Sequence, residues 1–199
     1  MKKNVLGIAL LSVIFSMHAM EQKSPRFSGP QKELTPALKS RLDALINTAP
    51  LRGWDSLLPN FGEILPLLAS PDFAGYDISN YKTQANQDTL LGLAVMTKNL
   101  KVVAILLEQY NVNPNVGNDG LNQTPLMLAC SSTDGFGNID DSDITMIQLL
   151  LRHGARLDVK DRNGFTCFDY AQNFIDNNQL EKVIAVLTTT PPTTSIKNY

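Results

Sequence analysis

The chain has 199 residues, of which 43% are hydrophobic and 18% charged, and 17 Lys and Arg against 19 Asp and Glu give a net charge of −2. This composition is that of one globular domain, and it excludes collagen-like, wholly disordered and disulfide-dense proteins. Nucleic acid and an anionic membrane surface are excluded as main partners, because both require clustered positive charge and the chain has no long run of basic residues.

Residues 1–19 predict a secretory signal peptide. Lys2 and Lys3 precede an uncharged, mostly apolar run from Val5 to Met17, which is shorter than the ~20 residues that a membrane-spanning helix needs. We expect cleavage after Ala19, which removes both lysines and takes the net charge from −2 to −4. A retained N-terminal anchor is the alternative. The prediction is an exported protein of bacterial type, periplasmic or secreted, with no membrane attachment after cleavage.

The next two segments are predicted to lead into the main fold. Residues 20–34 are expected to be a flexible linker, and residues 35–86 a degenerate N-terminal cap of helices. A first helix is expected to begin at Thr35-Pro36, with an apolar face made of Leu38, Leu42, Leu45, Ile46 and Ala49. A second helical segment, Trp54 to Ala69, is expected to be broken or kinked by Pro59, Gly62 and Pro66. Residues 70–86 are expected to form a long irregular connection.

Three segments then share one pattern, and their threonines lie 35 and 42 residues apart. They are Thr89-Leu90-Leu91-Gly92-Leu93-Ala94, Thr124-Pro125-Leu126-Met127-Leu128-Ala129 and Thr166-Cys167-Phe168-Asp169-Tyr170-Ala171. In each, a Thr hydroxyl can cap a helix, and the apolar residues then recur at helical spacing. A second apolar block follows each segment: Leu100–Leu107, Ile144–Leu151 and Leu180–Leu187. The pattern predicts repeated helix pairs.

These residues resemble the ankyrin-repeat family, in which a Thr-Pro-Leu-His-x-Ala helix is followed by a second apolar helix, Gly-Ala and a polar hairpin. The resemblance covers residues 87–187, about three repeats. It implies an all-α solenoid of stacked helix–turn–helix units with short hairpin tips. The composition of residues 188–199, with Pro191-Pro192 among threonines, predicts a disordered tail. Gly92, Met127 and Asp169 replace the family's His, so we expect the hydrogen bonds of that His to be missing. Leu90 and Cys167 stand where Pro is usual.

An insertion enlarges the connection inside the middle repeat. Twenty residues separate Ala129 from Leu149, whereas eleven separate Ala94 from Ile105. The insert, residues 131–143, is predicted to be flexible and acidic, with Phe136 and Ile139 as exposed apolar side chains. It could be a plain solvated loop, a partner contact or a calcium- or ligand-binding loop, although the terminal Glu of an EF-hand is missing.

The chemistry-bearing side chains predict no enzyme, metal site or cofactor. His153 precedes Gly154 at an expected helix end, where a structural role suffices. No nucleophile has a base at a recognisable spacing, and no Gly-rich loop for phosphate is present. Cys130 and Cys167 are expected on inner helices of successive repeats, too far apart to bridge, and we favour buried thiols over a disulfide.

The resemblance implies a monomeric module that binds another protein through hairpin tips and inner helices. The residues that we consider as contacts lie on two tips and in the insert. The candidate contact residues are Asn118, Asp119, Asn122, Lys160, Arg162, Asn163, Phe136 and Ile139. A secreted bacterial effector acting on a host protein is one interpretation. The alternative is a periplasmic inhibitor or protective partner of an envelope protein.

Overall fold

The computed structural model describes residues 32–33, 35–47, 61–68, 70, 76–83, 87–131 and 138–189. The predicted signal peptide and residues 190–199 of the predicted tail lie outside these residues. The described part contains two strands and eight helices. The strands are β1 (Lys32–Glu33) and β2 (Tyr76–Asp77), and the helices are α2 (Pro36–Asn47), α3 (Phe61–Leu68), α4 (Leu90–Met96), α5 (Leu100–Glu108), α6 (Pro125–Cys130), α7 (Asp141–Arg152), α8 (Cys167–Phe174) and α9 (Asn177–Thr189).

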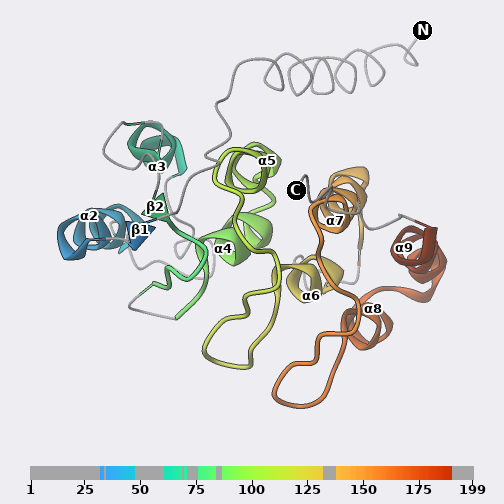
Figure 1. Cartoon of the computed structure of the whole chain (residues 1–199). Coiled ribbons are helices and arrows are strands. Elements are labelled where there is room, and N and C mark those ends of the chain that lie inside the picture. Colours follow the sequence, from blue (N-terminus) through green and yellow to red (C-terminus); the bar gives the residue numbers. More distant parts are fainter. Residues whose placement is uncertain are drawn as a thin grey trace, which may run out of the picture.

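The helices form stacked pairs. Helix α4 pairs with α5, α6 with α7 and α8 with α9, and the pairs follow one another along the array (Figure 1). The inner helices α4, α6 and α8 pack on one another in that order, and so do the outer helices α5, α7 and α9. Long loops between the pairs project from the side of the inner helices. The predicted all-α array of stacked helix–turn–helix units is confirmed.

The threonine of each motif begins an inner helix, as predicted. Thr89 Oγ1 accepts the N–H of Gly92 at 3.0 Å, and Thr124 Oγ1 accepts the N–H of Met127 at 3.3 Å. These bonds satisfy backbone donors that have no partner within the first helical turn. In the third repeat, the cap bond is reversed: the Asp169 carboxylate accepts both the N–H and the hydroxyl of Thr166, at 2.7 and 2.6 Å.

Two of the residues that replace the family's His at the fourth motif position make hydrogen bonds of their own. The Asp169 carboxylate binds Thr166, and Met127 Sδ accepts the N–H of Thr124 at 3.4 Å. These bonds arise because the fourth position is the third residue of the helix, from which a side chain reaches back to the cap. Gly92 alone has no side chain, and a Cβ there would lie 2.9 Å from Thr89 Oγ1.

A continuous apolar core lies between the two layers of helices. Leu106, Leu126 and Leu150, from three different helices, are each fully buried. A single pair cannot cover its own apolar faces, so each repeat depends on its neighbours for stability. Helix α7 ends at His153 as its C-cap, and Gly154 follows with φ +86°, which agrees with the predicted end of this helix.

The N-terminal helices lie at one end of the array, beside the α4–α5 pair (Figure 1). Leu38, Leu42 and Ile46 of α2 are buried as predicted, whereas Ala49 lies outside the described residues. The Tyr81 hydroxyl donates to the Asp43 carboxylate at 2.6 Å in a buried position. This bond attaches α2 to the segment that leads into the first repeat. Burial and the adjacent Asp43 raise the pKa of Tyr81 well above its ordinary value, so the hydroxyl stays a donor.

Expectations about the N-terminal region and about the tail need correction. Lys32 and Glu33 were assigned to a flexible linker but form β1, which pairs in parallel with β2 through the register Lys32↔Tyr76. That strand pairing also gives order to part of the connection predicted to be irregular. Helix α3 continues through Pro66 and is not broken there, because the proline forfeits one backbone bond while Ile64, Leu67 and Leu68 stay buried. Thr188 and Thr189, assigned to the tail, belong to α9.

The two cysteines are buried on successive inner helices, as predicted. Cys130 ends α6 and Cys167 begins α8, and the structure has both as free thiols. Helix α6 packs directly against α8, and the expectation that the two thiols are too far apart to bridge stays a prediction.

Candidate functional site: the hairpin tips

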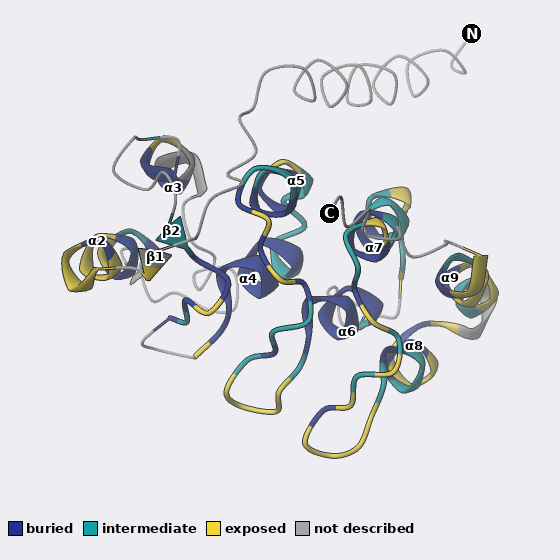
Figure 2. Cartoon of the chain, in the orientation of Figure 1, coloured by how far each residue is buried: buried dark blue, intermediate teal, exposed yellow. Residues whose placement is uncertain are grey.

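Three loops project beyond the inner helices, and we call them tip 1 (residues 82–88), tip 2 (residues 117–123) and tip 3 (residues 160–165). Residues 84–86 of tip 1 lie outside the described residues. Exposed residues are concentrated on tips 2 and 3, whereas α6 and most of α4 are buried (Figure 2). Tip 2 therefore offers accessible surface where the inner helix of its repeat offers none.

The same residue position closes each tip, and we call Thr83, Asn118 and Asp161 the tip-base residues. Their N–H groups donate across the loop to the carbonyls of Asp88, Gln123 and Phe165, at 3.0, 3.1 and 2.9 Å. A backbone bond at the same place in three repeats gives the tips a common framework.

The side chain of each tip-base residue also accepts hydrogen bonds from the loop above it. Asp161 Oδ1 accepts the N–H groups of Asn163 and Phe165 at 2.9 and 2.8 Å. Asn118 Oδ1 does the same for Leu121 and Gln123 at 3.2 and 3.0 Å. In these loops a short polar side chain accepts the hydrogen bonds that a backbone carbonyl would otherwise accept. The loops therefore hold their shape without strand pairing along their whole length.

Each tip has one residue in the left-handed region just before the inner helix. Gln87, Asn122 and Gly164 have φ values of 56°, 61° and 85°. Glycine adopts this conformation without steric cost, and asparagine tolerates it better than most residues. This shared turn directs the chain from the tip back into the following helix.

We predict that tip 2 discriminates between two glycine substitutions. A Cβ at Gly117 would lie 2.5 Å from the Asn122 carbonyl oxygen, whereas a Cβ at Gly120 would meet nothing closer than 3.9 Å. Gly117→Ala should therefore distort the tip and lower the free energy of unfolding by about 1–3 kcal/mol, and Gly120→Ala should leave it nearly unchanged. Urea unfolding of both variants tests this. Equal stabilities would show that the loop relaxes freely around residue 117.

Backbone bonds tie the tips into one row. The Asp119 N–H donates to the Gln87 carbonyl at 3.1 Å, and the Arg162 N–H donates to the Leu121 carbonyl at 2.8 Å. Lys82 of tip 1 also forms an ion pair with Asp119 of tip 2. Adjacent tips are thus fixed relative to each other, so side chains on different repeats can meet one partner with a constant spacing.

A polar network below the loops strengthens this row. Asn118 Nδ2 donates to Asp88 Oδ1 at 3.3 Å, and burial raises the Asp88 pKa against the opposing effect of that bond. Further along, Gln123 donates to the Tyr170 hydroxyl at 2.7 Å, which in turn donates to Asp161 Oδ2 at 2.9 Å. The network therefore crosses from the first repeat to the second and from the second to the third.

The structure divides the predicted contact residues on the tips into two kinds. Five are exposed: Asp119, Asn122, Lys160, Arg162 and Asn163. Asn118 is half-buried, and both its amide oxygen and its amide nitrogen bind other parts of the tips. Asn118 helps to build the tips because it occupies the tip-base position that Asp161 fills in the next repeat, and its role as a contact stays a prediction.

The sequence analysis missed two exposed apolar side chains on the same row. Leu121 of tip 2 is 42% exposed and Phe165 of tip 3 is 43% exposed. Their position in the sequence could have identified them, since both stand in polar turn segments just before a helix-capping threonine. The sequence analysis also expected the inner helices to contribute to the surface, but every residue of α6 is buried. In that repeat tip 2 is accessible and the inner helix is not.

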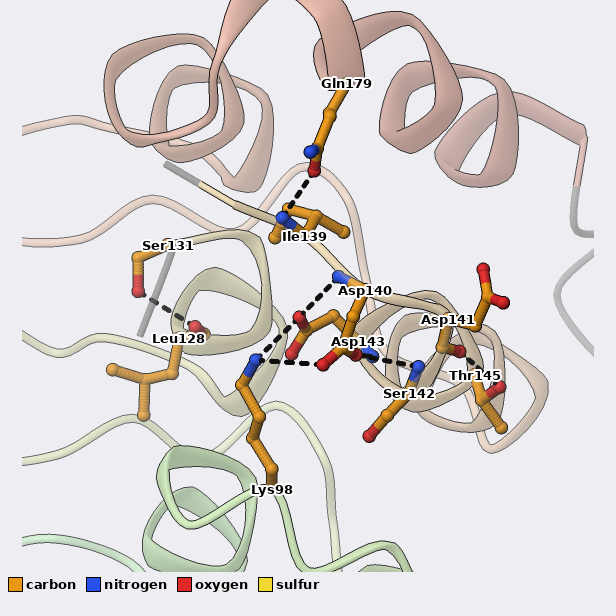
Figure 3. A network of polar contacts seen from close by, with 10 residues as sticks. All are labelled: Lys98, Leu128, Ser131, Ile139, Asp140, Asp141, Ser142, Asp143, Thr145 and Gln179. Carbon is orange, nitrogen blue, oxygen red and sulfur yellow. Dashed lines mark hydrogen bonds and ion pairs between the residues drawn. The ribbon is translucent and has the colours of Figure 1, made fainter. Parts of the chain in front are cut away.

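The end of the insert is held in place by both neighbouring repeats (Figure 3). Asp140 and Asp143 cap α7 reciprocally, each accepting the other's N–H at 3.0 Å. Lys98, in the turn between α4 and α5, reaches Asp143 at 2.8 Å and Asp140 at 3.7 Å. The N–H of Asp143 chiefly, with a further contribution from Lys98, lowers the Asp140 pKa.

Ile139 was expected to be an exposed side chain, and this is wrong. It is half-buried against the core, and its N–H donates to Gln179 of α9. The insert therefore ends in an ordered segment, because residues 138–143 are attached to the first repeat through Lys98 and to the third through Gln179. Phe136 lies outside the described residues, so its role as a contact stays a prediction.

Within the described residues, no group of three or more His, Cys, Asp or Glu side chains is placed to hold a metal ion. No helix in that part of the chain is long and apolar enough to cross a membrane. His153 caps α7, where its N–H donates to the carbonyls of Leu149 and Leu150.

Comparison with known proteins identifies the repeat. The family model for the ankyrin repeat matches residues 121–162, which run from tip 2 through α6 and α7 to the start of tip 3. The predicted resemblance is thereby confirmed for residues 121–162, which match the ankyrin repeat, a unit that generally serves as a non-catalytic scaffold for protein–protein interaction.

A solved ankyrin-repeat protein is also similar in structure, with a TM-score of 0.49 and 24% sequence identity over 64% of this chain. The match covers 57% of that protein, so the present chain spans less than two thirds of its length. A search of curated proteins gives no match to the sequence.

Proposed function

We propose that the chain binds another protein with its row of tips and performs no catalysis. The observation that carries this proposal is that some tip residues build the loops while others are exposed on their surface. Asn118 and Asp161 are used to build the loops, whereas Arg162, Leu121 and Phe165 are exposed on a backbone whose spacing is fixed. Exposed aromatic and arginine side chains on a rigid support are the residues that most often dominate the energy of binding.

We further propose that the chain is exported by its N-terminal segment and acts on a protein outside the cytoplasm. Lys2, Lys3 and the apolar run that follows support export. A host protein is our first candidate for the partner, and an envelope protein that this chain inhibits or protects is the second. Calcium binding by the insert has less support, since Asp140 and Asp143 already serve the α7 cap and Lys98.

A charge-matched pair of variants tests the proposed surface. Lys160→Ala with Arg162→Ala removes two positive charges from tip 3, and Lys101→Ala with Lys182→Ala removes two from exposed positions on the outer helices. The tip variant should capture the partner less well in pull-downs from producing and host cells, while the outer-helix variant should behave as the parent. Both should keep the parent's melting temperature, because single exposed charges contribute only about 0–1 kcal/mol.

One outcome would contradict the assignment to the tips. If the tip variant binds as the parent does, and replacing residues 132–137 by glycine and serine abolishes binding, then the insert is the binding element. The loss of Lys160 should not disturb the nearby Asp169 or unfold the tip variant. The lowered pKa of Asp169 comes chiefly from its bonds to Thr166 and only slightly from Lys160.

A further inference from the structure

Tip 3 has two positive charges without an ion-pair partner. Lys82 of tip 1 is neutralised by Asp119 of tip 2. Within the described residues, Lys160 and Arg162 of tip 3 are both exposed and neither forms an ion pair. The whole chain, by contrast, has a net charge of −2. Tip 3 therefore presents positive charge on the surface of an acidic protein.

The carboxylates next to these cations are already used inside the fold. Asp161 is buried, and its oxygens accept two N–H groups of the loop and a tyrosine hydroxyl of α8, at 2.9, 2.8 and 2.9 Å. Asp169 accepts the N–H and the hydroxyl of Thr166. Because buried Asp161 stands between exposed Lys160 and exposed Arg162, a partner meets the two cations at the surface and not the carboxylate.

Exposed apolar side chains lie beside these cations. Phe165 of tip 3 is 43% exposed, and Leu121 of tip 2 is 42% exposed. The Arg162 N–H donates to the Leu121 carbonyl at 2.8 Å, and the Asp161 N–H donates to the Phe165 carbonyl at 2.9 Å. These bonds hold both apolar residues next to the segment that carries the cations. The surface therefore combines positive charge with exposed apolar carbon at fixed positions.

We propose that tip 3, together with Leu121, recognises an acidic segment of the partner that also carries a large apolar side chain. Arg162 can bind a carboxylate through two parallel N–H groups, and Lys160 attracts a second carboxylate as a point charge. Phe165 and Leu121 supply the apolar contact. Two cations match a pair of carboxylates, whereas a nucleic-acid backbone needs a longer positive surface. This inference rests on the proposed function of the tips and adds the chemistry of the partner.

The test uses random peptides that are displayed on phage and selected on the immobilised full chain. We expect the selected peptides to be enriched in Asp and Glu close to Leu, Phe or another large apolar residue, and depleted in Lys and Arg. A selected acidic peptide, synthesised with a fluorescent label, should lose affinity as sodium chloride rises from ~50 to ~300 mM, because salt screens exposed charges. Its counterpart with Gln and Asn in place of Glu and Asp should bind much more weakly.

Variants of tip 3 show where the peptide binds. Lys160→Ala with Arg162→Ala should lower the affinity for the acidic peptide roughly tenfold, whereas Lys101→Ala with Lys182→Ala should bind it as the parent does. Lys160→Glu with Arg162→Glu should reverse the preference and bind a lysine counterpart of the peptide better than the acidic peptide. Circular dichroism checks that each variant is folded, and the alanine variant decides the question if the glutamate variant is not.

Two results would overturn the inference and leave the proposed function of the tips intact. In the first, the selected peptides are neutral or basic, yet Phe165→Ala weakens their binding. In the second, no peptide is enriched on the parent chain, which would show that the tips do not recognise a short segment. A third result would contradict both proposals: acidic peptides are enriched but bind the alanine variant of tip 3 and Phe165→Ala as tightly as the parent.

Discussion

Leu150→Ala should lower the free energy of unfolding by about 2–5 kcal/mol. Leu150 is fully buried in α7, the outer helix of the middle repeat, where it belongs to the core between the two layers. Removing its side chain leaves a cavity that helices on both sides would have to close. Because α7 contacts both α5 and α9, the loss should weaken the whole array and not one repeat alone. Urea unfolding followed by circular dichroism measures the change.

Ile184→Ala is the matched control for this prediction. Ile184 lies on α9 and is 39% exposed, so its truncation removes an apolar side chain with little loss of packing. We expect a change clearly smaller than that of Leu150→Ala. If both variants lost the same stability, α7 would not occupy the centre of a packed array, and the stacking described above would be incorrect.

Asp161→Ala should have the second-largest effect, a loss of about 2–4 kcal/mol. Asp161 is buried and accepts bonds from the N–H groups of Asn163 and Phe165 and from the Tyr170 hydroxyl. Alanine leaves these donors without their acceptor in the folded protein. We also expect tip 3 to lose its shape, which hydrogen exchange at Asn163 and Phe165 would report as faster exchange.

Asp161→Asn separates the tip-closing role from the charge. The amide oxygen can still accept from the loop, as Asn118 does at the equivalent place in tip 2. This variant should therefore lose less than half as much stability as Asp161→Ala and keep slow exchange in tip 3. A loss as large as that of alanine would mean that the carboxylate's charge, and not the loop geometry, holds tip 3 in place.

The repeated motif was sufficient to predict the main architecture. Thr89, Thr124 and Thr166 marked where the inner helices begin, and Gly154 marked the end of α7. These signals are local, because capping and left-handed turns depend on a few neighbouring residues. The same is true of the long connection after α6, whose extra length is visible as a change in spacing.

Contacts between repeats were harder to predict, since they depend on how one helix pair is placed on the next. The attachment of residues 138–143 to Lys98 is of this kind. The tip-base role of Asn118 was missed for a related reason. Tip 2 has one residue more than tip 3 between its tip-base residue and its capping threonine. Counting back from the threonine therefore aligns Asp161 with Asp119 and not with Asn118.

The central claim is that the row of tips is the surface that meets a partner. Hydrogen exchange of the chain, alone and with a captured partner, tests this most directly because it reports on every segment in one experiment. We predict that binding slows exchange in residues 117–123 and 160–165, while the outer helices α5, α7 and α9 exchange at unchanged rates. Slowed exchange confined to the outer helices or to residues 132–140, with the tips unaffected, would contradict the claim.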